Sequence, residues 1–398
     1  MRIGLFTNNY RPLVNGLATS VDTFADAFRQ RGHGVTIVAP RYAAGGRDDG
    51  DVLRVPGLRA PTHHAYVLPF PRWPGLRQAV LARDLDVYHA QHPFLLGTAA
   101  KRLARETDRP LVFTHHTRYD RYAHYIPGPA CLVARLAIQR ALRFAKSADL
   151  VIAPAPSVAR DLAARGVRTP IEVIPTGVPI MPQPTHEARD ARRMALGLGA
   201  GGPLCLSIGR LAREKNQAFL LHAFSRVIRA LPSARLVLVG DGDDRGRLTR
   251  LANDLGIWSS VRFIGSVPHE RVADYTSAAD LFLFPSTSET QGLAALEALA
   301  AGLPVVAVMS EAGADLLADE PAGILCPEDP DVFARSVLAL WASPERRRAM
   351  SVAARRLAAR YAPEATAARL LSLYQDLYGA RRSATASARP LHSRELRT

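Results

Sequence analysis

Two glutamates, Glu289 and Glu297, stand at places in the sequence where a carboxylate requires a chemical explanation. The surrounding segment, residues 284–307, reads FPSTSETQGLAALEALAAGLPVVA. An apolar run predicts a buried strand, a short polar loop holds Glu289, and a helix is expected over residues 292–301. One carboxylate would then lie at the mouth of a helix and the other within it.

Glu297 is the more unusual of the two, because the helix around it has no polar side. Leu293, Ala300 and Ala301 share its face at spacings of three and four, and the other faces are also alanine and leucine. Burying an unpartnered carboxylate costs on the order of several kcal/mol. Either Glu297 pairs with an arginine or lysine, or reaches solvent at the helix end, or it accepts hydrogen bonds from the hydroxyls of a ligand.

A second loop offers positive charge. Residues 209–216 read GRLAREKN, between an expected strand and an expected helix. Arg210 and Lys215 could clamp a diphosphate there, although a solvated basic loop has the same composition. The amides of Gln291, Gly292 and Leu293, at the helix mouth beside Glu289, would donate to the same anion.

Histidines follow predicted strands in the first half of the chain. His89 and His92 accompany one strand, and His115 and His116 follow another. Ligands of open parallel sheets bind beyond the carboxyl ends of the strands, so position favours a function for one of the adjacent pair over a role as ordinary loop residues. Gly16 precedes a helix N-terminus that could hold a phosphate, but the loop lacks the G-x-G-x-x-G fingerprint.

These loops need two alternating arrays of strands and helices to position them. Strands are expected near residues 3–7, 35–39, 52–55, 87–90, 111–115, 150–153 and 171–174, and again near 204–208, 235–240, 261–264, 281–284 and 303–308. The sequence therefore predicts two Rossmann-like parallel-sheet domains facing across a cleft. We expect an N-terminal domain over residues 1–180, a linker over 181–200, a second domain over 201–362, a C-terminal helix over 363–380 that packs back on the first domain, and a basic disordered tail over 381–398.

Composition narrows the partners. The 398 residues are 48% hydrophobic and carry a formal net charge of +15, which implies nucleic acid, an anionic membrane surface or phosphorylated ligands. The basic residues are scattered and no recognition element is evident, so nucleic-acid binding is disfavoured.

Other features argue against metal sites and membrane spans. Three separated cysteines lack metal-ligand spacing and predict free thiols in a reducing cytoplasm. The acidic turn at residues 241–244 is expected to cap a helix rather than to bind a metal. No run approaches ~18 unbroken apolar residues, and the N-terminus lacks a signal-peptide pattern.

Two segments could nevertheless touch lipid. Arg72 and Trp73 place an aromatic side chain beside a cation. The helix expected over residues 129–146 interleaves leucines with three arginines, and such a basic amphipathic helix can lie on an anionic membrane. The three arginines are Arg135, Arg140 and Arg143. The alternative interpretation is an ordinary surface helix whose arginines are solvated.

The motifs together resemble the retaining glycosyltransferases of the GT-B architecture, in the group 1 or family four class. GRLAREKN and the E-x7-E pattern of SETQGLAALE carry this resemblance, which covers nearly the whole chain. FTNNYRPLVNGLATSV, HAQHPFLLG and FTHHTRYDRYAHYIP resemble the bacterial 1,2-diacylglycerol 3-glucosyltransferases. The usual aromatic before the helix glycine is replaced by Gln291, and the usual Asn of an I-P-N-G pattern by Thr176.

The resemblance implies a role for each residue of the pattern. Arg210 and Lys215 would hold the donor diphosphate, Glu297 the ribose and Glu289 the hexose. His116, rather than His115, would contact the sugar near the reacting centre. Gly16 would bring its amide to the distal phosphate.

The resemblance also implies an activity: metal-independent, retaining transfer of a hexose to a membrane lipid such as diacylglycerol. Glucose from UDP-glucose is the expected donor, with no cofactor, at the inner face of the cell membrane. A GDP-mannose-dependent or other nucleotide-sugar-dependent enzyme with a different lipid or soluble glycan acceptor remains open. A nucleotide-sugar epimerase on the same architecture is disfavoured by the E-x7-E and GRLAREKN motifs.

Overall fold

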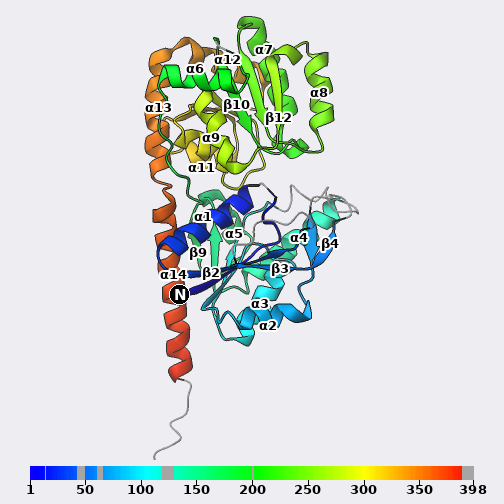
Figure 1. Cartoon of the computed structure of the whole chain (residues 1–398), viewed down its shortest axis with the longest axis vertical. Coiled ribbons are helices and arrows are strands. Elements are labelled where there is room, and N and C mark those ends of the chain that lie inside the picture. Colours follow the sequence, from blue (N-terminus) through cyan, green and yellow to red (C-terminus); the bar gives the residue numbers. More distant parts are fainter. Residues whose placement is uncertain (14, 43–49, 61–65, 119–129, 200, 388–398) are drawn as a thin grey trace, which may run out of the picture.

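The computed structural model describes residues 1–13, 15–42, 50–60, 66–118, 130–199 and 201–387. Two parallel sheets form two α/β domains, drawn one above the other in Figure 1. This arrangement confirms the predicted fold class. The long C-terminal helix α14 (Pro363–Ser387) leaves the second domain and runs down one side of the first.

The N-terminal sheet has the strand order β3-β2-β1-β6-β7-β8-β9, with every described pair parallel. Its strands are apolar on both faces because helices cover both sides. A small antiparallel pair, β4 with β5, lies outside this sheet. The elements are β1 (Arg2–Phe6), α1 (Gly16–Gln30), β2 (Gly34–Pro40), β3 (Val52–Val55), β4 (Gly57–Arg59), β5 (Val67–Pro69), α2 (Pro74–Leu81), β6 (Val87–Ala90), α3 (Leu96–Glu106), β7 (Leu111–Thr114), α4 (Ala130–Ala145), β8 (Leu150–Ala153), α5 (Pro156–Ala164) and β9 (Ile171–Val173).

The C-terminal sheet has the order β12-β11-β10-β13-β14-β15, again parallel. In both sheets the first strand is central, and the chain builds outward on one side before it crosses to the other. The elements are α6 (His186–Ala195), β10 (Leu204–Ile208), the 3-10 turn η3 (Arg213–Lys215), α7 (Gln217–Ala230), β11 (Arg235–Val239), α8 (Arg245–Asp254), the 3-10 turn η4 (Trp258–Ser260), β12 (Val261–Gly265), α9 (His269–Ala278), β13 (Leu281–Phe284), α10 (Leu293–Ala300), β14 (Val305–Val308), α11 (Glu311–Leu317), β15 (Gly323–Cys326), α12 (Pro330–Ala342) and α13 (Pro344–Ala359).

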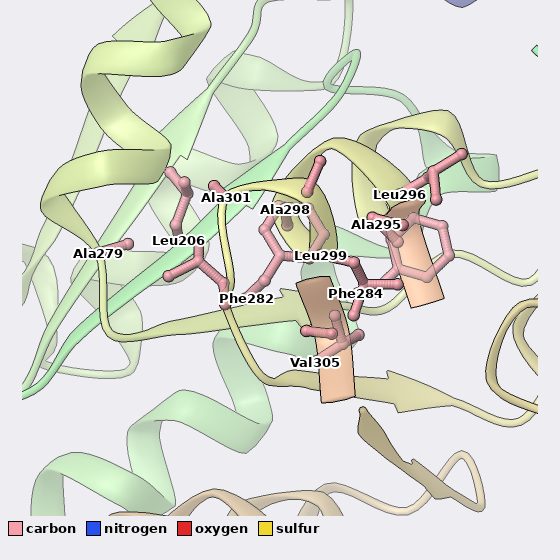
Figure 2. Packing of buried hydrophobic residues seen from close by; sticks show 14 of the residues in the cluster. Leu206, Ala279, Phe282, Phe284, Ala295, Leu296, Ala298, Leu299, Ala301 and Val305 are labelled. Atoms are coloured by element: carbon pink, nitrogen blue, oxygen red, sulfur yellow. The ribbon is translucent and has the colours of Figure 1, made fainter. Parts of the chain in front are cut away.

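Helix α10 is held in the core of the second domain. Phe282 and Phe284 of β13 lie against its buried face (Figure 2), and Leu296 and Leu299 are fully buried there. Truncating either leucine to alanine would cost about 2–5 kcal/mol, as is usual for buried leucines. The small residues on the remaining faces let α13 pack closely, so the mouth of α10 is fixed relative to the sheet.

The chain passes between the domains twice, and the two connecting segments contact each other. The outgoing segment passes Gly177, where a Cβ atom would lie 2.5 Å from Pro363 Cα on the returning segment. The Val178 amide donates to the Tyr361 carbonyl at 2.9 Å. Glycine is required at position 177 because these two backbones meet without room for a side chain.

Contacts beyond the crossings also join the domains. The carboxylate of Asp315 accepts from the Ser157 amide at 2.7 Å, so a side chain of α11 caps α5 of the other domain. Arg118 pairs with Glu311. Tyr374 of α14 is fully buried with Phe28 of α1, so α14 is part of the N-terminal core.

Four elements differ from the sequence predictions. Residues 186–195, expected within a linker, form α6, whose one buried side chain is Arg193 paired with Asp280 at 2.7 Å. A helix that is held by an ion pair has no apolar periodicity in its sequence, so the sequence did not indicate this helix. Strands β4, β5 and β15 were also missed, because each has only three or four residues.

The tail prediction was wrong in part, since α14 continues to Ser387. Arg381, expected in the tail, pairs with Asp149 at 2.7 Å and anchors that extension. Residues 388–398 lie outside the described residues. None of the described helices is long and apolar enough to cross a membrane.

Candidate functional site

The predicted loops gather at the two places where strand order reverses. Strands β10 and β13 are neighbours in the sheet, and the loops that leave their carboxyl ends are residues 209–216 and 285–292. In the first domain β1 and β6 have the same relation. Such switch points are where α/β proteins bind ligands, and here the two domains turn them toward each other.

Lys215 and Glu289 join the two loops of the second domain. The Lys215 Nζ donates to Glu289 Oε1 at 2.6 Å, and both side chains are largely buried. Burial would raise the pKa of Glu289, but the Lys215 charge and hydrogen bond, the Ser286 hydroxyl and the Arg210 charge outweigh it and lower the pKa. Glu289 is therefore a carboxylate at neutral pH, ready to accept hydrogen bonds.

Arg210 is positioned by Glu214, a residue that sequence reasoning passed over inside GRLAREKN. The two form an ion pair at the i,i+4 spacing, which was the available signal. The Glu214 carbonyl accepts from Ser288 Oγ at 2.9 Å, and the Arg210 carbonyl accepts from Gln217 Nε2 at 3.0 Å. Both loops are thus tied to each other before any anion arrives.

The structure removes one of the three interpretations left open for Glu297, namely an ion pair with an arginine or lysine among the described residues. Among the described residues, the one basic side chain within 4.0 Å of its carboxylate is His269, at 3.9 Å, so no arginine or lysine pairs with it. Burial raises its pKa to about 7. Its side chain is 17% exposed, which leaves an acceptor accessible to a ligand. His269 lies in no motif and could not have been selected from sequence.

His116 occupies the facing edge of the first domain. Its Nε2 lies 2.7 Å from Gln91 Oε1, and its carbonyl accepts from Thr290 Oγ1 at 3.0 Å, across the domain boundary. Burial, with His92, His89 and His115 nearby, lowers its pKa well below the usual value. The ring is neutral, and because the Gln91 oxygen can only accept, the proton resides on Nε2 and leaves Nδ1 as an acceptor.

The other histidines have structural partners. His89 is fully buried between Tyr374 Oη at 2.5 Å and Thr114 Oγ1 at 2.6 Å. His92 accepts the Asn8 amide at 3.1 Å, and burial lowers its pKa to about 4. These rings hold α14 and the loop after β1 in place beneath His116.

Gly16 begins α1 and faces the mouth of α10. A Cβ atom on Gly16 would lie 3.7 Å from Leu293 Cδ2, so the N-termini of the two helices converge. Within the described part of the chain, the backbone N–H groups of Gln291, Gly292 and Leu293 donate no hydrogen bond to protein. Two converging helix N-termini concentrate positive potential and suit a phosphate-bearing ligand.

The predicted role of Gln291 concerns its backbone amide, and its side chain has a separate partner. The Gln291 carboxamide bonds both backbone groups of Thr176 at 2.8 and 2.9 Å. The acidic turn at residues 241–244 differs from the expectation of capping. Asp244 is the N-cap of α8, but its carboxylate pairs with Arg247 at 2.6 Å instead of accepting from the helix backbone. Across the described residues, no group of three or more His, Cys, Asp or Glu could hold a metal ion.

The segments expected to touch lipid lie on the first domain. In α4, Leu132 and Leu136 are 51% and 53% exposed. Their basic neighbours are exposed as well, and these are Arg135, Arg140 and Arg143. Trp73 is not the free aromatic that the sequence suggested, because its ring packs against the N-terminal core. Arg72 is exposed, and the apolar side chains exposed near it are Leu68 and Phe70.

Comparison with known proteins identifies the family of the chain. Residues 188–357 match the family "Glycosyl transferases group 1", and residues 14–180 match "Glycosyltransferase Family 4". The chain is 33% identical over 351 residues to the alpha-monoglucosyldiacylglycerol synthase of Streptococcus pneumoniae, covering 87% of this chain and 79% of that protein.

Two further likenesses extend the comparison. The chain is 29% identical to a GDP-mannose-dependent alpha-(1-6)-phosphatidylinositol monomannoside mannosyltransferase of Mycolicibacterium smegmatis, covering 88% of this chain and 92% of that protein. Among solved structures, Anabaena Alr3699/HepE in complex with UDP and glucose aligns with a TM-score of 0.75 at 20% identity, covering 94% of this chain and 99% of that one. At that identity the likeness shows the fold alone.

Proposed function

The chain belongs to the group 1 and family 4 glycosyltransferases on a GT-B fold, and on that premise we propose that it transfers glucose from UDP-glucose to diacylglycerol with retention of configuration. The observation that carries the proposal is the convergence of the α1 and α10 mouths on the Lys215–Glu289 pair. That arrangement suits a ligand with phosphates and sugar hydroxyls side by side. The synthase from Streptococcus pneumoniae supports the choice of sugar and acceptor by its name.

The donor would lie between the two helix mouths. Its diphosphate would take hydrogen bonds from the α10 amides and charge from Arg210 and Lys215, with the Gly16 amide reaching the distal phosphate. When the nucleoside diphosphate leaves, negative charge develops at that point, and donors fixed in advance stabilise it. These groups supply the positive charge that the leaving group needs, so we propose that transfer requires no metal ion and no cofactor.

The two glutamates would hold the two sugars of the donor. Glu289 is ionised and would accept from the hexose hydroxyls, while its bond to Lys215 keeps it oriented. Glu297 lies about one turn into α10 and would accept from the ribose hydroxyls. His116 would contact the hexose near the reacting carbon through its Nδ1, as a neutral acceptor.

We further propose that retention is achieved by front-face transfer, without a covalent glycosyl-enzyme intermediate. Glu289 is engaged by Lys215 and by the hexose hydroxyls in this proposal, so it is not placed to attack the anomeric carbon. The acceptor hydroxyl would then approach on the face from which the diphosphate leaves. Closing the domains over the donor would exclude water and limit its hydrolysis.

We also propose that α4 brings the enzyme to an anionic membrane at the cytoplasmic face. Its exposed Leu132 and Leu136 could enter the interface while the neighbouring arginines contact lipid phosphates. Each basic residue near such a surface contributes about 1 kcal/mol of attraction. A diacylglycerol acceptor resides in that surface, so docking would place it next to the first domain.

The test is a donor panel scored by product mass. The full-length protein is incubated with UDP-glucose or GDP-mannose, with vesicles containing diacylglycerol or lacking it, and the anomeric configuration of the product is read by NMR. Glucosyl-diacylglycerol with the α configuration is expected from UDP-glucose. Transfer from neither donor, or a β product, would overturn the proposal.

Variants then connect the activity to the site. Glu289→Gln is compared with Glu345→Gln, which changes an exposed glutamate at the start of α13. Loss of transfer in the first variant alone is expected. Full activity in both would remove Glu289 from the reaction.

A second function stays in view because of the mycobacterial relative. Its name specifies GDP-mannose and a phosphatidylinositol mannoside. Product formation from GDP-mannose, and none from UDP-glucose, would favour that alternative on the same fold and the same two glutamates.

A further inference from the structure

Gln291 and Thr176 are the two positions at which the sequence departs from the family pattern, and in the structure they bind each other. The Thr176 amide donates to Gln291 Oε1 at 2.9 Å, and Gln291 Nε2 donates to the Thr176 carbonyl at 2.8 Å. The carboxamide thus mimics one rung of a β-ladder. Its two bonds join residues 115 positions apart, one in each domain.

The contact continues into the first domain through the threonine side chain. Thr176 Oγ1 donates to Ser20 Oγ at 2.7 Å, and both side chains are buried. Ser20 lies in the first turns of α1, the helix that begins with Gly16. A continuous series of hydrogen bonds therefore runs from the residue before the mouth of α10 to the N-terminal part of α1.

Thr176 also lies where the chain leaves the first domain. The next residue, Gly177, packs against Pro363 of the returning segment, and Val178 bonds Tyr361. Any rotation between the domains must change the backbone near these crossings. Gln291 attaches the donor side of the second domain directly to that point.

We propose that Gln291 is a positioning residue that couples the domain crossing to the donor site. Acting through Thr176 and Ser20, it fixes the distance between the α1 and α10 mouths, and it thereby sets how well both helix N-termini reach one diphosphate. The inference rests on the proposed donor site, but its domain-orientation component does not depend on the identity of the sugar.

The chemistry of the residue explains why a glutamine suits this place. A carboxamide offers a donor and an acceptor at one end, and both are needed to satisfy an N–H and a C=O together. Glutamate retains the acceptor and loses the donor. Methionine has a similar length and volume and loses both, which leaves two polar backbone groups without their partners.

The first measurement is of domain orientation and needs no substrate. Spin labels are placed on Cys131, an exposed native thiol of α4, and on Val352→Cys, at an exposed position of α13. The two other cysteines, Cys205 and Cys326, are buried. A narrow interdomain distance distribution is expected with Gln291, and a broader or displaced one with Gln291→Met.

The second measurement is kinetic. Gln291→Met is expected to weaken UDP binding and to lower transfer by about tenfold or more. The variant loses two hydrogen bonds, and the loss of each one corresponds to a factor of about ten or less. The ratio of UDP-glucose hydrolysis to transfer should rise, and Gln291→Glu should fall between methionine and wild type. A purely structural role would lower both reactions equally and leave the ratio unchanged.

Two further variants make the outcome decisive. Gln183→Met is the control, because Gln183 is an exposed glutamine of the segment that follows Thr176 between the domains, and its side chain donates to Ser351 Oγ at 3.3 Å. It should match wild type. Ser20→Ala cuts the far end of the series and should broaden the distances in the same direction as Gln291→Met, even if the methionine variant folds poorly.

Unchanged distance distributions in both Gln291→Met and Ser20→Ala would overturn the inference. So would an unchanged hydrolysis-to-transfer ratio in variants that fold. If the wild-type protein transfers no sugar at all, the proposed function fails, and the distance measurement still decides whether Gln291 fixes the domains.

Discussion

Glu297→Gln should make the stability of the protein less dependent on pH. Burial raises the pKa of Glu297 from 4.5 to about 7, so the folded state favours the protonated carboxyl. The resulting stability is fully present below about pH 4.5 and is lost as the pH rises through 7. Glutamine has nearly the same shape and does not ionise, so the variant should not show that loss.

The size of the effect follows from the interval between the two pKa values. From 4.5 to about 7, at about 1.4 kcal/mol per pH unit, the free energy of unfolding should fall by about 3 kcal/mol in the wild type relative to the variant. The side chain is 17% exposed, so partial solvation makes this an upper value. His269, at 3.9 Å, is the titratable group that faces it.

The assay is urea unfolding of the full-length wild type and of Glu297→Gln at intervals from pH 4.5 to 8. His269→Gln serves as a second reference, so that titration of the imidazole is separated from that of the carboxyl. We expect the two unfolding free energies to diverge with rising pH, the variant becoming the more stable. Parallel curves would show that Glu297 is not held in an apolar environment, and the ribose assignment would lose its physical basis.

Donor binding should lower the pKa of Glu297, which burial raises. Ribose hydroxyls donate hydrogen bonds to the ionised carboxylate, so a bound donor favours ionisation and lowers the pKa. If only the ionised form binds, the apparent Kd for UDP should be about tenfold weaker at pH 6 than at pH 8. The variant should show a flat Kd over this range, which calorimetry can measure directly.

Three other perturbations test the remaining parts of the site. Lys215→Ala should reduce kcat for transfer by about a hundredfold, because it removes a fixed donor to the leaving group, and it should raise the pKa of Glu289 in a titration followed by NMR. His116→Ala should lower kcat with UDP binding nearly unchanged, since its Nδ1 is assigned to the hexose and not to the nucleotide; an equal loss of UDP affinity would contradict the assignment. Leu132→Ser with Leu136→Ser should weaken sedimentation with anionic vesicles while activity on a soluble diacylglycerol analogue is retained, and Val352→Ser, at an equally exposed position of α13, should bind vesicles as wild type does.

Most of the fold could be predicted because its strands are buried on both faces. Continuous apolar runs such as residues 281–284 and 305–308 identify themselves without knowledge of their neighbours. Helix α6 was missed for the opposite reason. Helix α6 attaches to the domain through the ion pair of Arg193 with Asp280. Its sequence therefore needs no apolar face and has the polar composition of a linker. The end of α14 was missed because Arg381 finds Asp149 in a distant part of the sequence.

Candidate site residues could be selected from the sequence where they follow a predicted strand. Their hydrogen-bond partners elsewhere in the fold could not. Glu289 and Lys215 were selected because parallel strands bring their loops to one edge. The bond of 2.6 Å between them was not visible in the sequence. His269 comes from an element that carries no motif. Gln91 lies within HAQHPFLLG but was not selected as a partner of His116, since hydrogen bonds across the fold have no sequence spacing.

Departures from local rules proved more informative than agreement with them. Glu297 breaks the apolar pattern of its helix, and the structure gives it neither arginine nor lysine within reach among the described residues, so the pattern alone does not account for the cost of placing it there. Gln291 and Thr176 each depart from the expected motif, and the structure shows that the two departures meet in one pair of hydrogen bonds. The departures at Glu297 and at Gln291 have opposite effects on the free energy of folding. Burial of the Glu297 carboxylate costs stability, which the proposed bonds from ribose hydroxyls would offset. The Gln291 carboxamide adds two hydrogen bonds between the domains, which the proposed positioning role would use.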